Sequence, residues 1–238
     1  MKAVTYDFWN TLMWEEPGTM RGIRRRQVEL ALREAELEVD ADAIEQGLLA
    51  ISGKQRDAWM NGEMFQPEDG ARHFVGSLGD GLSARQQALL TEALLLGSVR
   101  PELNAADEVH STLRALKEND FKLAIVCDVG LAPSTVLRDS LDGAGLLEYF
   151  DGWAFSDEVG HYKPSPEIFQ HALDAIGATP EEAWHVGDLR RTDVAGSRSF
   201  GMTPVRYRGV ADDAEDHPDA SHVITGHSEI LELLGLAA

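Results

Sequence analysis

Cysteine, long apolar runs and basic residues are all scarce in this sequence. Cys127 is the single cysteine among 238 residues, which excludes an intrachain disulfide and favours a reducing compartment. No apolar stretch approaches the roughly 18 residues that a membrane-spanning helix requires. Asp7 interrupts the short apolar start of the chain, which is not typical of a signal peptide. We therefore predict a cytoplasmic protein without a membrane partner.

The shortage of basic residues leaves the chain strongly acidic. Its 21 Lys and Arg residues stand against 41 Asp and Glu residues, which gives a formal net charge of −20. A field of this sign repels nucleic acids and anionic membrane surfaces, so both are excluded as partners. It also repels an anionic substrate, which would need a nearby cation in order to bind. No feature of the sequence sets the oligomeric state.

Residues 14–99 carry the apolar spacing that is typical of helices, and they show no strand pattern. Helices are predicted at about 20–37 and 42–59. A further helix is predicted at 83–95, with Ser83 as its N-cap. This segment is therefore predicted to be an all-helical domain.

From about residue 100 onward, predicted helices and strands alternate. This alternation predicts an α/β fold, a Rossmann-like doubly wound parallel sheet with helices on both faces. The strand around Val4 and Tyr6 belongs to the same sheet, so the predicted core comprises 1–13 and 100–238, with the helical domain 14–99 inserted. The acidic segment 211–219 is expected to be a solvated loop. The predicted strands are 121–126, 152–155, 183–186, 203–207 and 222–224, and the predicted helices are 104–119, 135–144, 166–176, 194–200 and 228–236.

Several of the predicted strands end in polar residues. Taken singly, these residues have ordinary roles as turn formers or helix caps. The carboxyl ends of parallel strands, however, share one edge of a sheet, and open α/β sheets bind their ligands there. The residues in question are Asp7, Cys127, Asp128, Gly187, Asp188 and Asp193, with Lys163 and Pro164 in the segment between Asp128 and Gly187.

The order and spacing of these residues resemble the haloacid dehalogenase superfamily of hydrolases. The first motif of that family corresponds to Asp7-Phe-Trp-Asn-Thr-Leu, and Cys127 stands where the second motif has Ser or Thr. The lysine motif corresponds to Lys163-Pro-Ser-Pro-Glu-Ile-Phe. The fourth motif corresponds to Gly187-Asp-Leu-Arg-Arg-Thr-Asp193. The resemblance implies a Rossmann-like core with an inserted helical cap.

The resemblance also implies roles for individual residues. Asp7 would be the nucleophile that forms an aspartyl intermediate, and Lys163 would hold it and balance the charge of the transferred group. Mg²⁺ would be bound by the carboxylates of Asp7 and Asp188 and the backbone carbonyl of Trp9, with Asp193 as a ligand or a support. Cys127 completes the expected catalytic set, and the expected substrate-binding residues are Trp9, Asp128 and Asn10.

Two departures from the family pattern bear on the reaction. Trp9 replaces the Asp that serves phosphatases as general acid and base, and an indole cannot shuttle a proton. Cys127 is a poorer hydrogen-bond donor than a hydroxyl, and Asp128 adds negative charge near the expected phosphate. The leading hypothesis is a Mg²⁺-dependent phosphatase, acting on a small phosphorylated metabolite, with the proton carrier displaced or missing.

Three alternatives remain open. Family dehalogenases have an aromatic residue at the position of Trp9 and need neither metal nor proton donor, and arginines in the segment 21–26 could bind a carboxylate and a halide. The intact Asp188 and Asp193 argue against this reaction. A phosphonate hydrolase would require a cap lysine that forms a Schiff base, for which Lys54 is the candidate. A non-catalytic protein that binds a phosphorylated ligand is the last alternative.

Overall fold

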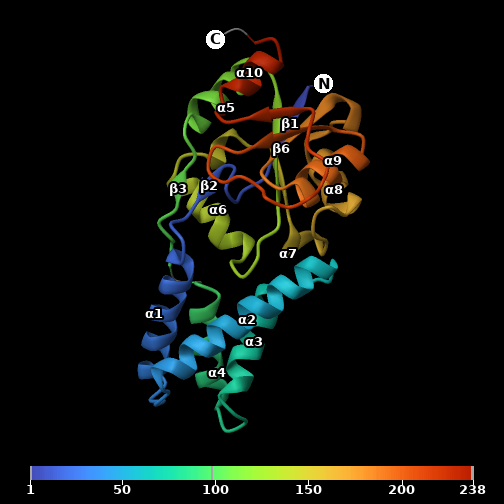
Figure 1. Ribbon diagram of the computed structural model, residues 1–238. Coiled ribbons are helices and arrows are strands. Elements are labelled where there is room, and N and C mark those ends of the chain that lie inside the picture. The colour runs from blue at the N-terminus through green and yellow to red at the C-terminus, as the bar shows by residue number, and fades with distance from the viewer. Residues whose placement is uncertain (1, 98, 237–238) are drawn as a thin grey trace. The chain divides into compact units, whose positions relative to one another are not determined.

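The computed structural model describes residues 2–97 and 99–236, and its central feature is a six-stranded sheet (Figure 1). Every pairing between neighbouring strands in this sheet is parallel. The predicted doubly wound α/β fold is therefore confirmed. The strands, in spatial order, are β5 (Gly152–Phe155), β4 (Lys122–Cys127), β1 (Ala3–Tyr6), β6 (Ala183–Gly187), β7 (Thr203–Tyr207) and β8 (His222–Ile224).

The register of β1 against its two neighbours determines where the polar strand ends lie. Tyr6 is the register partner of Ile125 on one side and of Val186 on the other. Asp7 follows directly, and its backbone N–H donates to the Val186 carbonyl at 2.8 Å. The residues after β1, β4 and β6 consequently reach the same edge of the sheet, as the sequence predicts.

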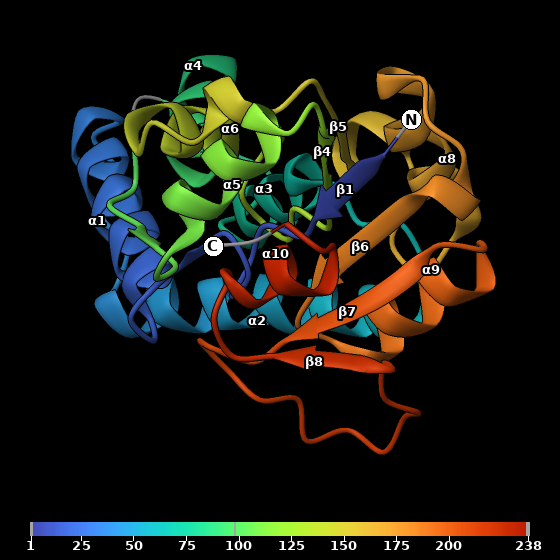
Figure 2. The ribbon, with the colours of Figure 1, turned by 90° about the horizontal axis from the view of Figure 1, so that it is seen from above.

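Helices cover both faces of the sheet (Figure 2). On one face, α8 (Pro166–Ile176) packs on β4 and β5, and α9 (Ala195–Ser199) lies beside it. On the other face lie α5 (Val109–Glu118) and α10 (Glu229–Leu233), which contact each other. The face under α8 is apolar: Ile168, Phe169 and Leu173 are fully buried against Ala124, Val126 and Ala154. Further helical elements of the chain include α6 (Ser134–Gly143), α7 (Ser156–Val159) and a π-helical turn at Arg190–Val194.

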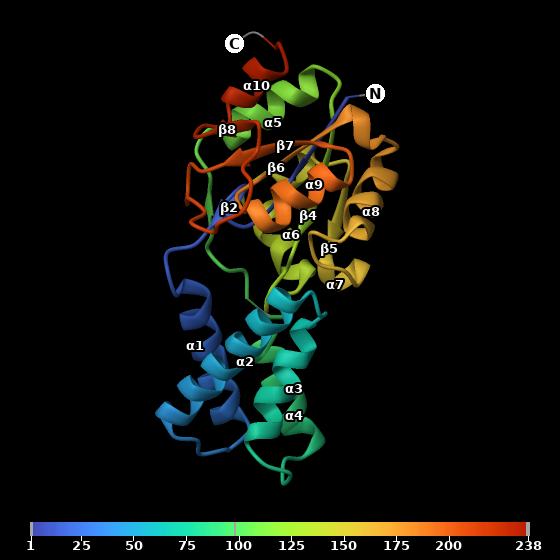
Figure 3. The same cartoon turned by 45° about the vertical axis from the view of Figure 1, so that its right-hand side comes forward.

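In the inserted segment, helices joined by loops are the regular secondary structure of the described residues between Glu15 and Glu102 (Figure 3). The chain divides into two compact units, and the helical unit comprises Glu15–Glu102 together with Val129–Ser140. Its core is formed by fully or largely buried apolar residues such as Val28, Leu48, Phe74 and Leu90. The helices are α1 (Thr19–Glu34), α2 (Ala41–Asn61), α3 (Pro67–Ser77) and α4 (Ala84–Leu94).

Two local features differ from the sequence predictions. The helix expected from residue 104 begins at Val109, because Asn104 and Ala105 form β3, which pairs with β2 (Met13–Trp14). The helix α3 was not predicted, because its Gly and Pro residues resemble a loop. Pro67 lies in its first turn, where a missing N–H costs nothing, and Gln66 with Asp69 forms a capping box.

Within the described residues, no helix is both long and apolar enough to cross a membrane.

Candidate active site

Four charged side chains are buried together at the carboxyl edge of the sheet. Asp7 follows β1, Asp188 follows β6, Asp193 lies in the π-helical turn, and Lys163 comes from the loop before α8. None of the four is more than 5% exposed. One oxygen from each of the three carboxylates lies within 4.8 Å of the other two. The structure thus brings together the residues that the sequence predicts as nucleophile, lysine and acidic metal ligands.

Lys163 joins two of the three carboxylates. Its Nζ donates to Asp7 Oδ1 at 2.5 Å and to Asp193 Oδ1 at 2.7 Å. Burial lowers the pKa of Lys163, but the charges of Asp193 and Asp7 outweigh it and hold that pKa well above its usual value. The loop that carries Lys163 is held in turn by Asp128, whose Oδ1 accepts from the Lys163 backbone N–H at 2.9 Å. Lys163 is therefore a fixed ammonium group beside the carboxylate of Asp7.

Both oxygens of Asp193 are occupied by hydrogen bonds from the protein. Oδ1 accepts from Lys163 and interacts with His185 Nε2 at 3.0 Å, while Oδ2 accepts from the Leu189 N–H at 3.0 Å and the Thr192 hydroxyl at 3.4 Å. Burial raises the pKa of Asp193, but the ammonium of Lys163 and the bond to His185 bring it below its usual value. The Asp193 carboxylate is therefore suited to orienting Lys163 and to holding the backbone that follows Asp188, through the Leu189 N–H.

His185 is a site residue that the sequence reasoning missed. It is 1% exposed, and its Nδ1 lies 2.7 Å from the Thr5 hydroxyl. The ring of Phe169 packs edge-on against it, with 5.2 Å between the ring centroids. Burial lowers its pKa, so the neutral imidazole is favoured. A histidine inside an otherwise apolar strand is the sequence signal that could have indicated it.

Burial and mutual repulsion raise the pKa values of the other two carboxyl groups. The pKa of Asp7 rises to about 7, mainly through burial, against which the charge of Lys163 acts. The pKa of Asp188 lies well above its usual value because of burial and the charges of Asp7 and Asp193. Three carboxylates thus share one ammonium group, and the excess negative charge favours binding of a cation. Oxygen donors in this arrangement fit a hard divalent ion such as Mg²⁺.

The turn after β1 positions Trp9 and Asn10. The Asn10 N–H donates to the Met13 carbonyl at 2.8 Å, and its φ of 54° places it in the left-handed region that Asn tolerates. The Asn10 side-chain amide donates to Asp188 Oδ2 at 3.3 Å. Trp9 is half-buried and lies edge-to-face with Phe8, with 4.8 Å between the ring centroids. The sequence predicts Asn10 as a substrate-binding residue, and this stays a prediction; in the structure its amide contacts a carboxylate of the cluster.

Cys127 ends β4 and is fully buried. Burial and the charge of Asp7 raise the pKa of its thiol well above the usual value, so the neutral thiol is favoured. This environment does not activate a nucleophile. The end of β4 therefore offers the cluster a neutral thiol, which is a weak hydrogen-bond donor.

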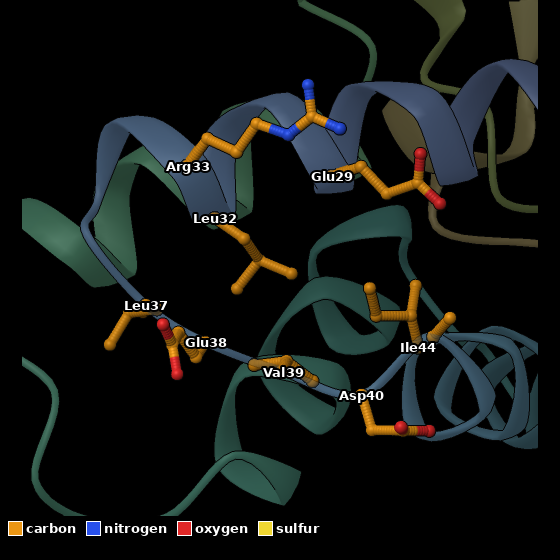
Figure 4. A pocket seen from close by; sticks show the side chains of 9 residues that line it. Glu29, Leu32, Arg33, Leu37, Glu38, Val39, Asp40 and Ile44 are labelled. Carbon is orange, nitrogen blue, oxygen red and sulfur yellow. The ribbon is translucent and has the colours of Figure 1, made fainter.

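A pocket of about 500 Å³ lies within the helical unit and is lined by residues between Glu29 and Ile44 (Figure 4). It lies between the end of α1 and the start of α2. Leu32 and Ile44 line it, and its charged groups come from Glu29, Arg33, Glu38 and Asp40. None of the predicted site residues lines it, so the charged cluster remains the candidate active site.

Comparison with known proteins agrees with this geometry. The family model described as haloacid dehalogenase-like hydrolase matches residues 1–201. Glyceraldehyde 3-phosphate phosphatase of Methanopyrus kandleri is 38% identical over 113 residues, which cover 47% of each chain. (S)-2-haloacid dehalogenase 1 of Pseudomonas sp. strain CBS-3 is 31% identical over 134 residues, 56% of this chain and 57% of the relative. These matches thus span about half the length of the two curated relatives.

The solved structures include a HAD phosphatase from Thermococcus onnurineus with 28% sequence identity and a TM-score of 0.69. The superposition covers 99% of this chain and 98% of the other. The family model covers far more than half of the sequence, and the shared fold extends over nearly all of it. The chain belongs to the haloacid dehalogenase-like hydrolase family.

Proposed function

We propose that this hydrolase is a Mg²⁺-dependent phosphatase that acts on a small phosphorylated metabolite through a covalent intermediate on Asp7. The observation that carries the proposal is the buried cluster of three carboxylates around the single ammonium group of Lys163. A buried excess of negative charge is costly without a cation. The likeness to two phosphatases, one of them over nearly the full chain, supports the same reaction class.

The residues divide into those that would hold the metal and those that would support them. Asp7 and Asp188 would bind Mg²⁺ through their carboxylates, and the Trp9 backbone carbonyl would be a further ligand. Asp193 is better suited to support, because its oxygens already accept hydrogen bonds from four protein groups. Bound Mg²⁺ would neutralise the charge between Asp7 and the phosphoryl oxygens.

The chain's own groups then account for the covalent chemistry. Asp7 attacks phosphorus, the ester oxygen leaves, and water subsequently attacks the aspartyl-phosphate at phosphorus and releases inorganic phosphate. Lys163 holds the Asp7 carboxylate in position and offsets charge on the transferred group. Trp9 cannot protonate the leaving oxygen. The favoured substrates are therefore phosphates whose leaving groups need little protonation, such as acyl or aryl phosphates.

Trp9 also favours a second candidate function, carbon–halogen hydrolysis. A halide needs no proton in order to leave, and the chain is similar to a haloacid dehalogenase over about half its length. The acidic cluster argues against this function, because attack of Asp7 on carbon requires no metal. The phosphonate hydrolase alternative lacks support, since Lys54 is exposed on α2 rather than desolvated as a Schiff-base lysine would be.

The test compares wild type with Asp7→Asn on acyl, aryl and alkyl phosphates, with Mg²⁺ or with a chelator, and on a 2-haloacid. We expect Mg²⁺-dependent phosphate release by wild type, fastest on acyl or aryl phosphates, and none by Asp7→Asn. Single turnover in ¹⁸O-water should label phosphate and leave Asp7 unlabelled. Halide release without Mg²⁺, with label in Asp7 from attack on an alkyl ester, would instead establish the dehalogenase.

A further inference from the structure

The acidic loop, residues 211–219, is bound to the segment that follows Asp188. The sequence predicts a solvated loop, and most of its residues are indeed exposed. Three of its carboxylates are nevertheless held by arginine side chains or backbone amides of the sheet-containing unit. The sequence assigns these carboxylates no partner, and the mechanism above does not use them.

Arg206 anchors both ends of the acidic loop to β7. Its side chain is 2% exposed, and its residue is the register partner of Gly187, which immediately precedes Asp188. Nε and Nη2 donate to the two oxygens of Asp219 at 2.7 and 3.0 Å, and Nη1 donates to Asp212 at 2.6 Å. A bidentate pair of this kind fixes geometry as well as charge. The loop is therefore attached to the strand next to the catalytic edge.

Asp213 extends this attachment to the segment after Asp188. Its Oδ2 accepts from the backbone N–H of Arg190 at 2.7 Å, and its Oδ1 accepts from the Glu215 N–H at 2.8 Å. The Arg190 side chain returns the contact by donating to the Glu215 carbonyl at 2.9 Å. The Glu215 N–H thus orients the Asp213 carboxylate, whose other oxygen binds the Arg190 N–H.

The backbone amide that precedes Arg190 is also held by a carboxylate. Leu189 N–H donates to Asp193 Oδ2 at 3.0 Å, so the two amides that directly follow Asp188 are bound by carboxylates from two different segments. Hydrogen bonds from N–H to an ionised carboxylate are stronger than those between neutral groups. Together they restrict the backbone that carries Asp188, while the Asn10 amide restrains its side chain.

We propose that Asp213 is a positioning residue that keeps the carboxylate of Asp188 directed into the cluster with Asp7. The metal-binding consequence rests on the function proposed above. If the segment after Asp188 samples other conformations, the apparent affinity for Mg²⁺ falls by the fraction of molecules that remain competent to bind. The acidic loop thus affects the site indirectly, through the segment after Asp188, and does not itself bind metal or substrate.

The test uses Asp213→Ala, Asp213→Asn and the control Asp216→Ala. Asp216 is an exposed residue of the same loop and forms no hydrogen bond or ion pair with any residue that the structure describes. Hydrogen exchange of the segment 188–193 is measured in metal-free protein, and Mg²⁺ affinity is measured by calorimetry. We expect faster exchange and roughly tenfold weaker Mg²⁺ binding in Asp213→Ala. This change corresponds to about one tenth of the molecules remaining competent to bind the ion. Asp213→Asn keeps an oxygen acceptor and should recover most of both properties.

Each outcome bears on the inference separately from the proposed function. Equal exchange in Asp213→Ala and Asp216→Ala would overturn it, as would faster exchange with unchanged Mg²⁺ affinity. A wild-type protein that does not bind Mg²⁺ would overturn the proposed function and the metal-binding consequence, while the exchange result would still decide whether Asp213 holds the segment. If Asp213→Ala fails to fold by circular dichroism, Asp213→Ser replaces it as the variant that lacks the carboxylate, and Asp213→Asn remains the variant expected to behave like wild type.

Discussion

Asp188 and Asp193 differ in how many protein groups each carboxylate already binds. Asp193 accepts from groups on four residues, whereas Asp188 accepts a hydrogen bond from the Asn10 amide at 3.3 Å. A carboxylate with unused lone pairs is the better direct ligand for a hard cation. Among the described residues, Asp188 and Asp7 are therefore the carboxylates best placed for direct coordination.

Replacement of Asp188 by Asn should weaken Mg²⁺ binding by at least about tenfold, because even supporting residues of metal sites contribute 10–100-fold. The amide keeps the shape of the side chain but removes its charge. Isothermal calorimetry on wild type and Asp188→Asn measures the difference, with Asp216→Asn as a control for the loss of one surface charge. Equal Mg²⁺ affinity in the first two proteins would contradict the assignment.

Trp9 separates the candidate reactions at the scale of a single residue. If phosphate-ester hydrolysis is the native reaction, Trp9→Asp should restore a general acid and raise turnover of alkyl phosphates by about tenfold or more. Acyl phosphates should gain much less, because their leaving group needs little protonation. Steady-state phosphate release on both substrate types measures this contrast.

The control for Trp9→Asp is its folding. Trp9 is half-buried and packs against Phe8, so loss of the ring should cost less than the roughly 3–5 kcal/mol of a fully buried Trp. Trp9→Phe removes the indole without adding a carboxylate, so it isolates the packing effect. A well-folded Trp9→Asp protein with no gain on alkyl phosphates would count against the phosphatase proposal.

At the scale of elements, local patterns predicted most of the fold and most of the site. The buried strands β1, β4 and β6 carry apolar runs that end in polar residues, and parallel pairing brings those ends to one edge. Asp7 and Asp188 could be predicted for this reason, whereas Lys163 follows no strand and was predicted from the lysine motif of the family. The pairing of Asn104 with Trp14 could not, because nothing local to either residue distinguishes a short strand from the start of a helix.

Contacts between charged residues of distant segments could not be predicted from the sequence either. Asp213 and Arg190 are 23 positions apart, and a cluster of acidic residues is equally compatible with a solvated surface. Asp128 and Asn10 are predicted as substrate-binding residues, and in the structure Asp128 contacts the Lys163 backbone and Asn10 contacts Asp188. Residue type and spacing indicated which groups gather, whereas pairing depended on the three-dimensional path of the loops.

Helix α2 offers a matched pair of glycines for a packing test. A Cβ at Gly47 would lie 2.7 Å from the buried Phe74 ring of α3, whereas no atom lies within 4 Å of a Cβ at Gly53. Gly53→Ala should stabilise by roughly 0.5–1 kcal/mol through helix propensity. Gly47→Ala should be destabilising on balance, because forcing extra volume into a packed core costs about 1–3 kcal/mol.

Thermal unfolding of both variants and wild type, followed by circular dichroism, measures this difference. The comparison within one helix cancels the propensity gain that both substitutions share. A Gly47→Ala protein as stable as Gly53→Ala would show that α2 and α3 can separate without cost.

At the scale of the whole molecule, negative charge exceeds positive charge both in the full chain, with its net charge of −20, and in the buried cluster. The surface charges are screened by any salt, whereas the buried ones require a cation at the site. The two contributions can therefore be separated by comparing MgCl₂ with NaCl at equal ionic strength. Stabilisation by Mg²⁺ beyond that of NaCl reports on the site.

The pKa shifts of the cluster determine how the stability of the folded protein changes with pH. A carboxyl group whose pKa is higher in the folded than in the unfolded state binds more protons when folded, so stability falls as pH rises between the two values. For Asp7 this interval runs from about 4 to about 7, and Asp188 shifts in the same direction. Asp193, whose pKa is lowered, is ionised in both states above about pH 5 and does not contribute there.

Asp7 and Asp188 should therefore lower the stability of metal-free protein between pH 5 and pH 7.5, and Mg²⁺ should offset this contribution more at the higher pH. The buried His185 and His227 act in the opposite direction whether or not Mg²⁺ is present, so the quantity to compare is the gain in stability on adding Mg²⁺ at each pH. At a free Mg²⁺ concentration 100 times the dissociation constant, the gain is about 2.7 kcal/mol, roughly 5–10 °C in Tm for a chain of this length. At pH 5 protons compete for the same carboxylates, so the gain should be much smaller. Thermal melts at both pH values, with NaCl-matched controls, measure the difference, and Asp188→Asn should reduce it. An equal Mg²⁺ effect at pH 5 and pH 7.5 would mean that the ion acts on the acidic surface rather than on the buried carboxylates.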